Sequence, residues 1–343
     1  MMTIDMHAHW NPPALIQAFR ERTAPPLIET NEDGVEVLRT THGSQPISEV
    51  FDDVETRLAE MDRQGVSTGV LSLFGMHQWI ERLPAEESVP LCRIYNDHVS
   101  EICAANAGRF AAYASLPQAD MDAAVAEFER AIDLPGIVGG VVPGNAFLTR
   151  PDAEAYRPLL AAANAHKAML FIHWGPTPGD TWPRTPPGTD NFARRMGTID
   201  MQQSLSADMV TLCMTDILDE YPDAMIHIHN LGGNIPYEIE RMDHRCLLDT
   251  PDEPLPSTCM NKPGLYMDCN SFGAQAIEMG VKLYGADKIL FGTDGTEFGA
   301  DWSAKAVAEA DIGEAARNAI LHGNAARVLS HLATFAPLSE AAE

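Results

Sequence analysis

The feature of this sequence that most restricts its fold is an eightfold alternation of short apolar runs with longer amphipathic segments. The apolar runs are continuous, as is typical of parallel strands buried on both faces, and they cover residues 3–9, 66–74, 110–116, 137–142, 168–173, 224–229, 265–269 and 288–293. Helices are predicted over residues 51–64, 91–107, 121–132, 152–166, 207–221, 235–248 and 274–284, and a helical tail over residues 304–310 and 314–332. Eight strands, each followed by a helix, predict an α/β chain folded as a closed (β/α)8 TIM barrel.

Two long segments rich in proline and glycine interrupt this alternation, after the first and after the fifth strand. They cover about residues 11–50, with room for a short hairpin around Gly34, and about residues 174–206. In a barrel both would open onto the carboxyl ends of the strands, so we expect them to form a lid and substrate walls. We expect residues 1–335 to form one domain and residues 336–343 a C-terminal tail. An open doubly wound sheet is the alternative, but no glycine-rich phosphate-binding fingerprint follows any strand.

Several of the predicted strands end in side chains that bind metal ions well. His7 and His9 are two residues apart in the first strand and therefore project from the same face. His173 ends the fifth strand and Asp294 follows the eighth. Neutral imidazole is the commonest nitrogen ligand of zinc-like metals. The pattern predicts a ring of strand ends around one ion.

Composition excludes several classes of function. The net charge of −26 and the pI near 4.7 argue against a nucleic-acid partner or an anionic membrane surface, because both require a basic face. The six cysteines include no Cys-x-x-Cys pair, which favours reduced thiols in a cytoplasm over a disulfide framework. The first strand begins almost at Met1, so no signal peptide is expected, and no apolar run is long enough to span a bilayer. We expect a soluble cytoplasmic protein.

The ordered motifs of the chain resemble those of the amidohydrolase superfamily. The most similar branch is that of aminocarboxymuconate-semialdehyde decarboxylase, also called amidohydrolase-related. Besides His-Ala-His at residues 7–9, the shared phrases are GRFAAYASLP at 108–117, GGNIPY at 232–237, GLYMD at 264–268, YGADKILFGTD at 284–294 and HGNAARVL at 322–329. The resemblance covers nearly the whole chain. It implies a divalent metal ion, zinc or alternatively manganese, and either nonoxidative decarboxylation or hydrolysis of small carboxylated substrates. It also implies a homodimer.

The resemblance assigns roles to particular residues. His7, His9, His173 and Asp294 would hold the ion, and Asp294 and His229 would carry protons during catalysis. Binuclear members of the superfamily bridge two metals with a lysine on the fourth strand. Residues 137–142 contain no lysine, which favours one metal ion.

The sequence departs from the family pattern in two places. The family has a histidine before the glycine run that follows the sixth strand, but an ungapped alignment puts Asn230 there, and only a shift of one residue restores His229. Asparagine cannot exchange protons at neutral pH, so only the alignment shifted by one residue gives this chain a proton-carrying residue at that position. The proline usual after the last aspartate is also missing, and Glu297 is expected as an additional carboxylate near the metal.

The substrate is expected to be a small carboxylic acid. Trp174 adjoins His173 and would form a wall for a flat molecule, with Asn230 close by. The arginines of the two long segments are the candidates for binding its carboxylate, and they are Arg39, Arg184, Arg194 and Arg195. We predict a metal-dependent carboxy-lyase of an aromatic or muconate-type acid. The alternatives are a metal-dependent hydrolase of a lactone, amide or C–C bond, and an inactive metal-binding barrel.

Overall fold

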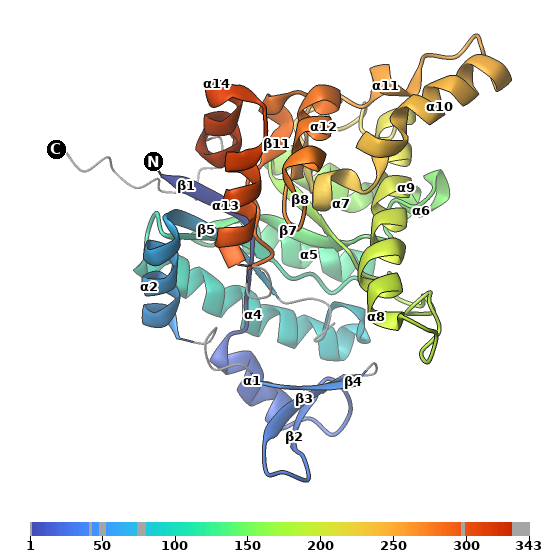
Figure 1. Cartoon of the computed structure of the whole chain (residues 1–343). Coiled ribbons are helices and arrows are strands. Elements are labelled where there is room, and N and C mark those ends of the chain that lie inside the picture. The colour runs from blue at the N-terminus through green and yellow to red at the C-terminus, as the bar shows by residue number, and fades with distance from the viewer. Residues whose placement is uncertain (1, 41–42, 48–52, 74–79, 296–298, 331–343) are drawn as a thin grey trace.

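Eight parallel strands form a ring in the computed structural model of the chain (Figure 1). In order around the ring they are β1 (Thr3–Trp10), β5 (Val66–Leu73), β6 (Phe110–Ala114), β7 (Ile137–Pro143), β8 (Met169–His173), β9 (Met225–Ile228), β10 (Leu265–Asp268) and β11 (Ile289–Leu290). The ring closes because the Met6 N–H donates to the Phe291 carbonyl at 2.9 Å and because Ala8 bridges to Gly295 in parallel fashion. The predicted (β/α)8 barrel is therefore confirmed.

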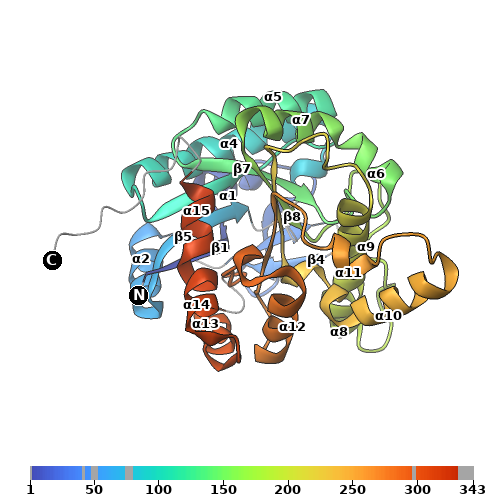
Figure 2. The same ribbon diagram turned by 90° about the horizontal axis from the view of Figure 1, so that it is seen from above.

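The structure describes residues 2–40, 43–47, 53–73, 80–295 and 299–330. Glu297 and the tail predicted at residues 336–343 lie outside this range. Helices surround the strands (Figure 2). They are α1 (Pro13–Arg20), α2 (Val54–Gln64), α4 (Ala85–Ala105), α5 (Met121–Ile132), α6 (Arg150–Ala155), α7 (Arg157–His166), α8 (Phe192–Arg194), α9 (Met201–Met214), α10 (Ile235–Asp249), α11 (Pro256–Cys259), α12 (Ala274–Tyr284), α13 (Gly299–Glu309), α14 (Gly313–Asn318) and α15 (Asn324–Leu329). Within the described residues, no helix has the length and apolar character needed to cross a membrane.

Apolar side chains pack in two layers. The outer cluster fills the space between the strands and the helices. The inner cluster fills the barrel near the beginnings of the strands, and it includes Ile4, Val70 and Phe171 together with Val328 and Leu329 of α15. Because α15 packs against the beginnings of the strands, only the opposite end, where the strands finish, is left for a site.

An irregularity in β1 decides which of its side chains point into the barrel. Ile4 and Met6 belong to the inner cluster, whereas Ala8 and Trp10 belong to the outer one. Pairing with β5 shifts register between Asp5 and Ala8, as in a β-bulge. The bulge reverses the alternation of inward and outward side chains, so that after Met6 the side chains that point into the barrel are those of the two histidines of this strand.

The segment after β1 contains a second, small sheet. Its strands β2 (Leu27–Thr30), β3 (Glu36–Thr40) and β4 (Gly43–Pro46) are antiparallel. Gly34 takes a positive φ of 78° in the turn between β2 and β3, and the Asn31 Oδ1 accepts backbone N–H bonds from Asp33 and Val35. The hairpin predicted around Gly34 is confirmed. In Figure 1 this sheet projects from one end of the barrel.

Several predicted helix boundaries are wrong. The helix predicted over 91–107 is α4, which begins earlier, at Ala85, and contains Pro90. The burial of its long apolar face stabilises the helix by more than the loss of the hydrogen bond that the proline cannot make. The helix predicted over 152–166 is split at Tyr156, because Pro158 cannot donate to the carbonyl four residues earlier.

The segment predicted as a loop up to residue 206 becomes helical earlier than expected. A short helix, α8, leads through one π-helical stretch (Arg195–Asp200) into α9, which begins at Met201. α9 then ends at Met214 and not at residue 221, because Thr215 is extended, with φ −120° and ψ 174°.

Candidate metal centre

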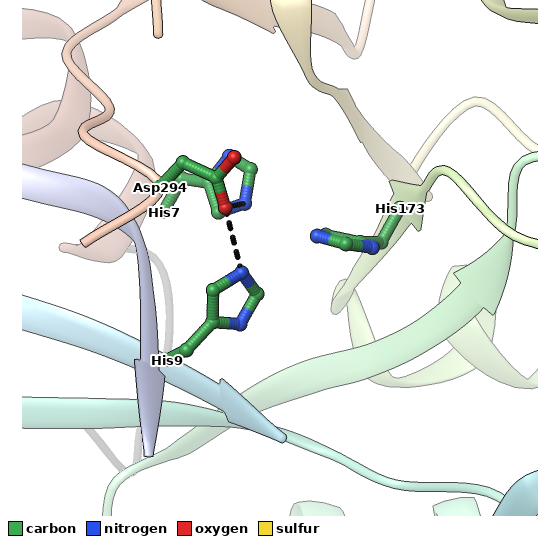
Figure 3. A group of neighbouring side chains, drawn as sticks. All are labelled: His7, His9, His173 and Asp294. Atoms are coloured by element: carbon green, nitrogen blue, oxygen red, sulfur yellow. Dashed lines mark hydrogen bonds and ion pairs between the residues drawn. The ribbon is translucent and has the colours of Figure 1, made fainter. Parts of the chain in front are cut away.

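Four side chains from three strand ends converge at the open end of the barrel. His7 and His9 extend from β1, His173 is the last residue of β8, and Asp294 follows β11. Each offers one ligand atom, and these atoms all lie within 4.8 Å of one another. Figure 3 shows His173 facing the other three across a common space. The sequence predicted this grouping, and the bulge in β1 is what allows it.

The hydrogen bonds around the imidazoles direct one nitrogen of each ring to the centre. The His173 Nδ1 lies 3.2 Å from the Trp174 carbonyl oxygen, which can only accept, so the proton sits on Nδ1. Its buried Nε2 then carries a lone pair and has no hydrogen-bond partner within the described protein. The His7 Nδ1 bonds to Asp268, and the His9 Nδ1 to the Ser72 hydroxyl at 3.0 Å. Three imidazole nitrogens and one carboxylate oxygen fit a divalent cation.

The electrostatics of the site favour a positive charge at its centre. The Asp294 Oδ1 lies 2.8 Å from the His9 Nε2 and 3.3 Å from the His7 Nε2. Burial would raise the pKa of Asp294, but the two histidines outweigh it and hold the pKa well below its usual range. For His7, burial opposes protonation, yet Asp268 and Asp294 raise its pKa to about 10. A proton on His7 or a divalent cation between the ligands can supply the charge that these carboxylates attract.

Asp268 is a candidate functional residue to which the sequence alone assigned no role. It ends β10, is fully buried, and its Oδ2 lies 3.0 Å from the His7 Nδ1 and 2.9 Å from the His227 Nε2. Its Oδ1 accepts the backbone N–H groups of Asn230 and Asn270, each at 3.1 Å. A carboxylate on the outer nitrogen of a metal-binding histidine fixes its ring and tautomer. An aspartate closing an apolar strand was the signal that could have identified it.

The two histidines of β9 and its following turn differ in their surroundings. His227 is buried deeper, between Asp268 and the Tyr113 hydroxyl, 3.0 Å from its Nδ1. The His229 Nε2 accepts the Trp174 backbone N–H at 3.0 Å, so its proton lies on Nδ1. The rings of His229 and His173 stack at 4.9 Å. Burial and the charge on His7 lower the pKa of His229 to about 3.

Asn230 is buried beside this centre in an unusual backbone conformation. Its φ is 52°, its Nδ2 donates to the Met201 sulfur at 2.9 Å, and its Oδ1 has no partner in the described part of the chain. Asp294 also has a positive φ, of 55°. Positive φ is uncommon outside glycine and tends to concentrate at functional sites.

A small cavity of about 50 Å³, partly open to solvent, adjoins the metal centre at His173. Its apolar lining comes from Leu73, Val141, Pro143, Trp174, Pro176 and Pro178. Glu81, Arg82 and Gln118 supply its polar groups. Trp174 was predicted from the sequence as a wall, whereas Glu81 and Arg82, which lie in the short 3₁₀ helix η2 (Ile80–Arg82) after β5, were not predicted.

The arginines expected to bind the substrate carboxylate lie elsewhere. Arg39 is on β3, exposed and paired with Glu29. Arg194 is exposed on α8, and Arg195 pairs with Asp190 at 3.0 Å. None of these three is among the described residues that line the cavity.

Comparison with known proteins gives a consistent result. The family model described as Amidohydrolase matches residues 4–330. The γ-resorcylate decarboxylase of Rhizobium sp. (strain MTP-10005) is 28% identical over 320 residues, covering 86% of this chain and 93% of that protein.

Solved structures share the fold. A Metarhizium anisopliae IDCase in apo form superposes with a TM-score of 0.78 at 20% identity, covering 97% of this chain and 98% of that one. The dihydroxybenzoic acid decarboxylase of Polaromonas sp. JS666, with bound manganese and the inhibitor 2-nitroresorcinol, gives a TM-score of 0.73 at 23% identity, covering 96% of each chain.

Proposed function

Since the chain belongs to the amidohydrolase family, we propose that it is a metal-dependent nonoxidative decarboxylase of a small aromatic carboxylic acid. The observation that carries the proposal is the convergence of His7, His9, His173 and Asp294, whose ligand atoms lie within 4.8 Å of one another. The similarity of the chain to a decarboxylase, over 86% of the length of the chain, favours carbon dioxide release over hydrolysis.

The four residues would hold one divalent ion, zinc or manganese, through the Nε2 atoms of the histidines and the Oδ1 of Asp294. When bound, such an ion supplies a Lewis acid that binds a carboxylate or hydroxyl oxygen of the substrate and stabilises negative charge. The surrounding residues keep that arrangement ready, because Asp268 and the Trp174 carbonyl hold the protons of His7 and His173 on their outer nitrogens.

Decarboxylation replaces the bond between the ring carbon and the carboxylate with a bond to hydrogen, so one proton must reach the ring carbon. Asp294 and His229 are the predicted proton carriers. The Asp294 side chain is 15% exposed and so lies at the open side of the centre. His229 is neutral, with its proton on Nδ1, and a second proton on Nε2 would face the Trp174 N–H. The proton that His229 could give up is therefore the one on Nδ1, which is buried.

Metal analysis and product analysis test the proposal. Protein purified without chelator or a nickel column should contain about one zinc or manganese ion per chain by mass spectrometry. The His7→Ala variant should lose it. The metal-loaded protein should release CO2 from γ-resorcylate or related hydroxybenzoates. Uptake of water by lactones or amides without CO2 release would favour the hydrolase alternative, and the absence of any bound metal would favour the inactive barrel.

We also infer that the protein is a homodimer, that it lies in the cytoplasm and that it has no nucleic-acid partner. Residues 1–335 of each chain would form one domain. The charge of −26 supports the absence of a nucleic-acid partner. The six cysteines are free, which supports a reducing compartment. Sedimentation of the purified protein would test the dimer.

A further inference from the structure

We propose that the outward face of α10 is the surface through which two copies of this chain associate. The inference rests on the homodimer inferred above and gives it a location. It does not depend on the proposed reaction.

Exposed apolar side chains concentrate on α10 and on the neighbouring helix α9. Ten large apolar side chains are exposed among the described residues, and five of them belong to these two helices: Val210, Met214, Tyr237, Leu247 and Leu248. Figure 1 and Figure 2 show α10 at the periphery of the barrel, with one end projecting from it. A concentration of exposed apolar side chains on one part of a surface marks a contact with another molecule.

α10 presents a regular stripe of side chains to solvent. Its buried face contains Ile235, Ile239 and Cys246. The exposed residues on its opposite side are spaced by four, three and four positions, and they are Tyr237, Arg241, His244 and Leu248. The two apolar members are the most exposed large side chains of the stripe, Tyr237 at 75% and Leu248 at 60%. This spacing is the one with which two helices pack along their length.

An open groove of about 460 Å³ borders the stripe, between α9 and α10. Its apolar lining includes Val210 and Met214 from α9 and Met242 from α10. A specific interface buries about 800 Å² on each partner. A partner that packs on the stripe over such an area would also cover this groove, and with it the exposed side chains of α9.

The order of charges on α10 identifies the partner as a second copy. From the beginning of the helix to its end, the charged residues at the groove are Glu238, Arg241, Arg245 and Asp249, so their signs read the same from either end. In a two-fold dimer the helix would lie antiparallel to the same helix of the other copy, and the surface must therefore fit its own reverse. A shift of about one turn places Glu238 of each copy beside Arg245 of the other and Tyr237 near Leu248.

The overall charge makes this local complementarity necessary. Two copies with a net charge of −26 each repel one another, so association requires contacts between opposite charges. Arg245 pairs with Asp249 one turn away on its own helix. Because an exposed pair of this kind contributes little stability, Arg245 can also bind Glu238 of the other copy.

Sedimentation equilibrium of the purified protein over a range of concentrations tests the surface. The wild type should be a dimer. Leu248→Asp should raise the dissociation constant of the dimer about 10- to 100-fold, because it removes an apolar contact and buries a carboxylate against Tyr237. Trp302→Asp is the matched control, since Trp302 is an equally large apolar residue, 53% exposed, on the distant helix α13. It should dimerise like the wild type.

A charge swap tests whether the contact is made between two copies of the same helix. Glu238→Arg and Arg245→Glu should each weaken the dimer about 10-fold, because each creates two contacts between like charges. The double variant should recover most of the wild-type affinity, because every contact between the two positions is then simply reversed. Circular dichroism would show that each variant keeps its helices.

Three results would overturn the proposal. A monomeric wild type would refute both the homodimer and this surface, and would leave a different protein as the partner of α10. Wild-type association in Leu248→Asp, or no recovery in the double variant, would keep the homodimer but place its contact elsewhere. The proposed reaction is tested separately by CO2 release, so the failure of either inference can be told from the failure of the other.

Discussion

Replacing Asp268 with asparagine should weaken metal binding while leaving the four ligands unchanged. In the folded protein the Oδ1 of Asp268 accepts two backbone N–H groups. An asparagine would therefore place its amide oxygen, and not its NH2 group, opposite these two donors. The amide NH2 would then face the His7 Nδ1 and the His227 Nε2. Two donors cannot share a hydrogen bond, so His7 would move its proton to Nε2, the atom that should bind the metal.

The neighbouring Asn270 increases this effect. Its Nδ2 lies 2.9 Å from the same His7 Nδ1 and would donate to that nitrogen once the carboxylate is gone. In the wild type the negative charge of Asp268 keeps the proton on Nδ1. Removal of a carboxylate that orients a metal-binding histidine typically reduces metal affinity by about 10- to 100-fold, or about 1.4–2.7 kcal/mol.

Competition with a fluorescent chelator at fixed pH measures this loss directly for zinc and manganese. Asp301→Asn is a suitable control, because Asp301 is an exposed aspartate that pairs with Arg63. The control should bind metal like the wild type. Wild-type affinity in Asp268→Asn, with circular dichroism showing an intact fold, would refute the argument about the tautomer of His7.

Three further substitutions test other parts of the molecule. Asp294→Asn should abolish turnover in a folded protein, because the amide cannot carry the proton, and wild-type CO2 release would contradict its role. His229→Asn should reduce the rate on the order of 10²-fold or more if His229 is the acid or base, whereas an unchanged kcat would exclude it. Burial raises the pKa of Asp208 well above its usual value despite the charge of Arg184. The folded state therefore holds this proton more tightly than the unfolded state does, and the free energy of unfolding falls as pH rises from about 4 through the folded pKa. In urea unfolding, the free energy of unfolding of Asp208→Asn should depend less on pH over that range than that of the wild type. At higher pH it should exceed the wild-type value by an amount on the order of 1 kcal/mol. The same pH dependence in both proteins would refute this.

The barrel and the grouping of the candidate metal ligands were predictable because they depend on short-range patterns. Continuous apolar runs indicate strands buried on both faces, and a side chain at the end of such a run lies at the open end of the barrel. His173 and Asp294 were identified in this way. Helix boundaries near Pro90 and Pro158 were less predictable, because the balance between a lost hydrogen bond and a buried helix face depends on tertiary packing.

The cavity residues were not predictable from local pattern. Arg82 lies in a short 3₁₀ helix with no apolar periodicity, and its relation to His173 exists only because β5 and β8 belong to the same ring. Arg39, Arg194 and Arg195 were chosen because they lie in long loops, yet each is hydrogen-bonded to a neighbouring loop or hairpin residue. Loop position alone does not distinguish an arginine that faces the site from one that faces solvent.

The sequence contains two His-x-His pairs at strand ends, and the structure gives them different tasks. In His7-x-His9 the bulge of β1 turns both rings inward, and their outer nitrogens are held by Asp268 and Ser72. In His227-x-His229 the nitrogens that could have bound the ion are engaged, one by Asp268 and the other by the Trp174 N–H. The spacing of two residues fixes only that the side chains share a face. Whether a histidine can act as a ligand depends on which ring nitrogen the surrounding donors and acceptors leave available, and Asp268 contacts one histidine of each pair.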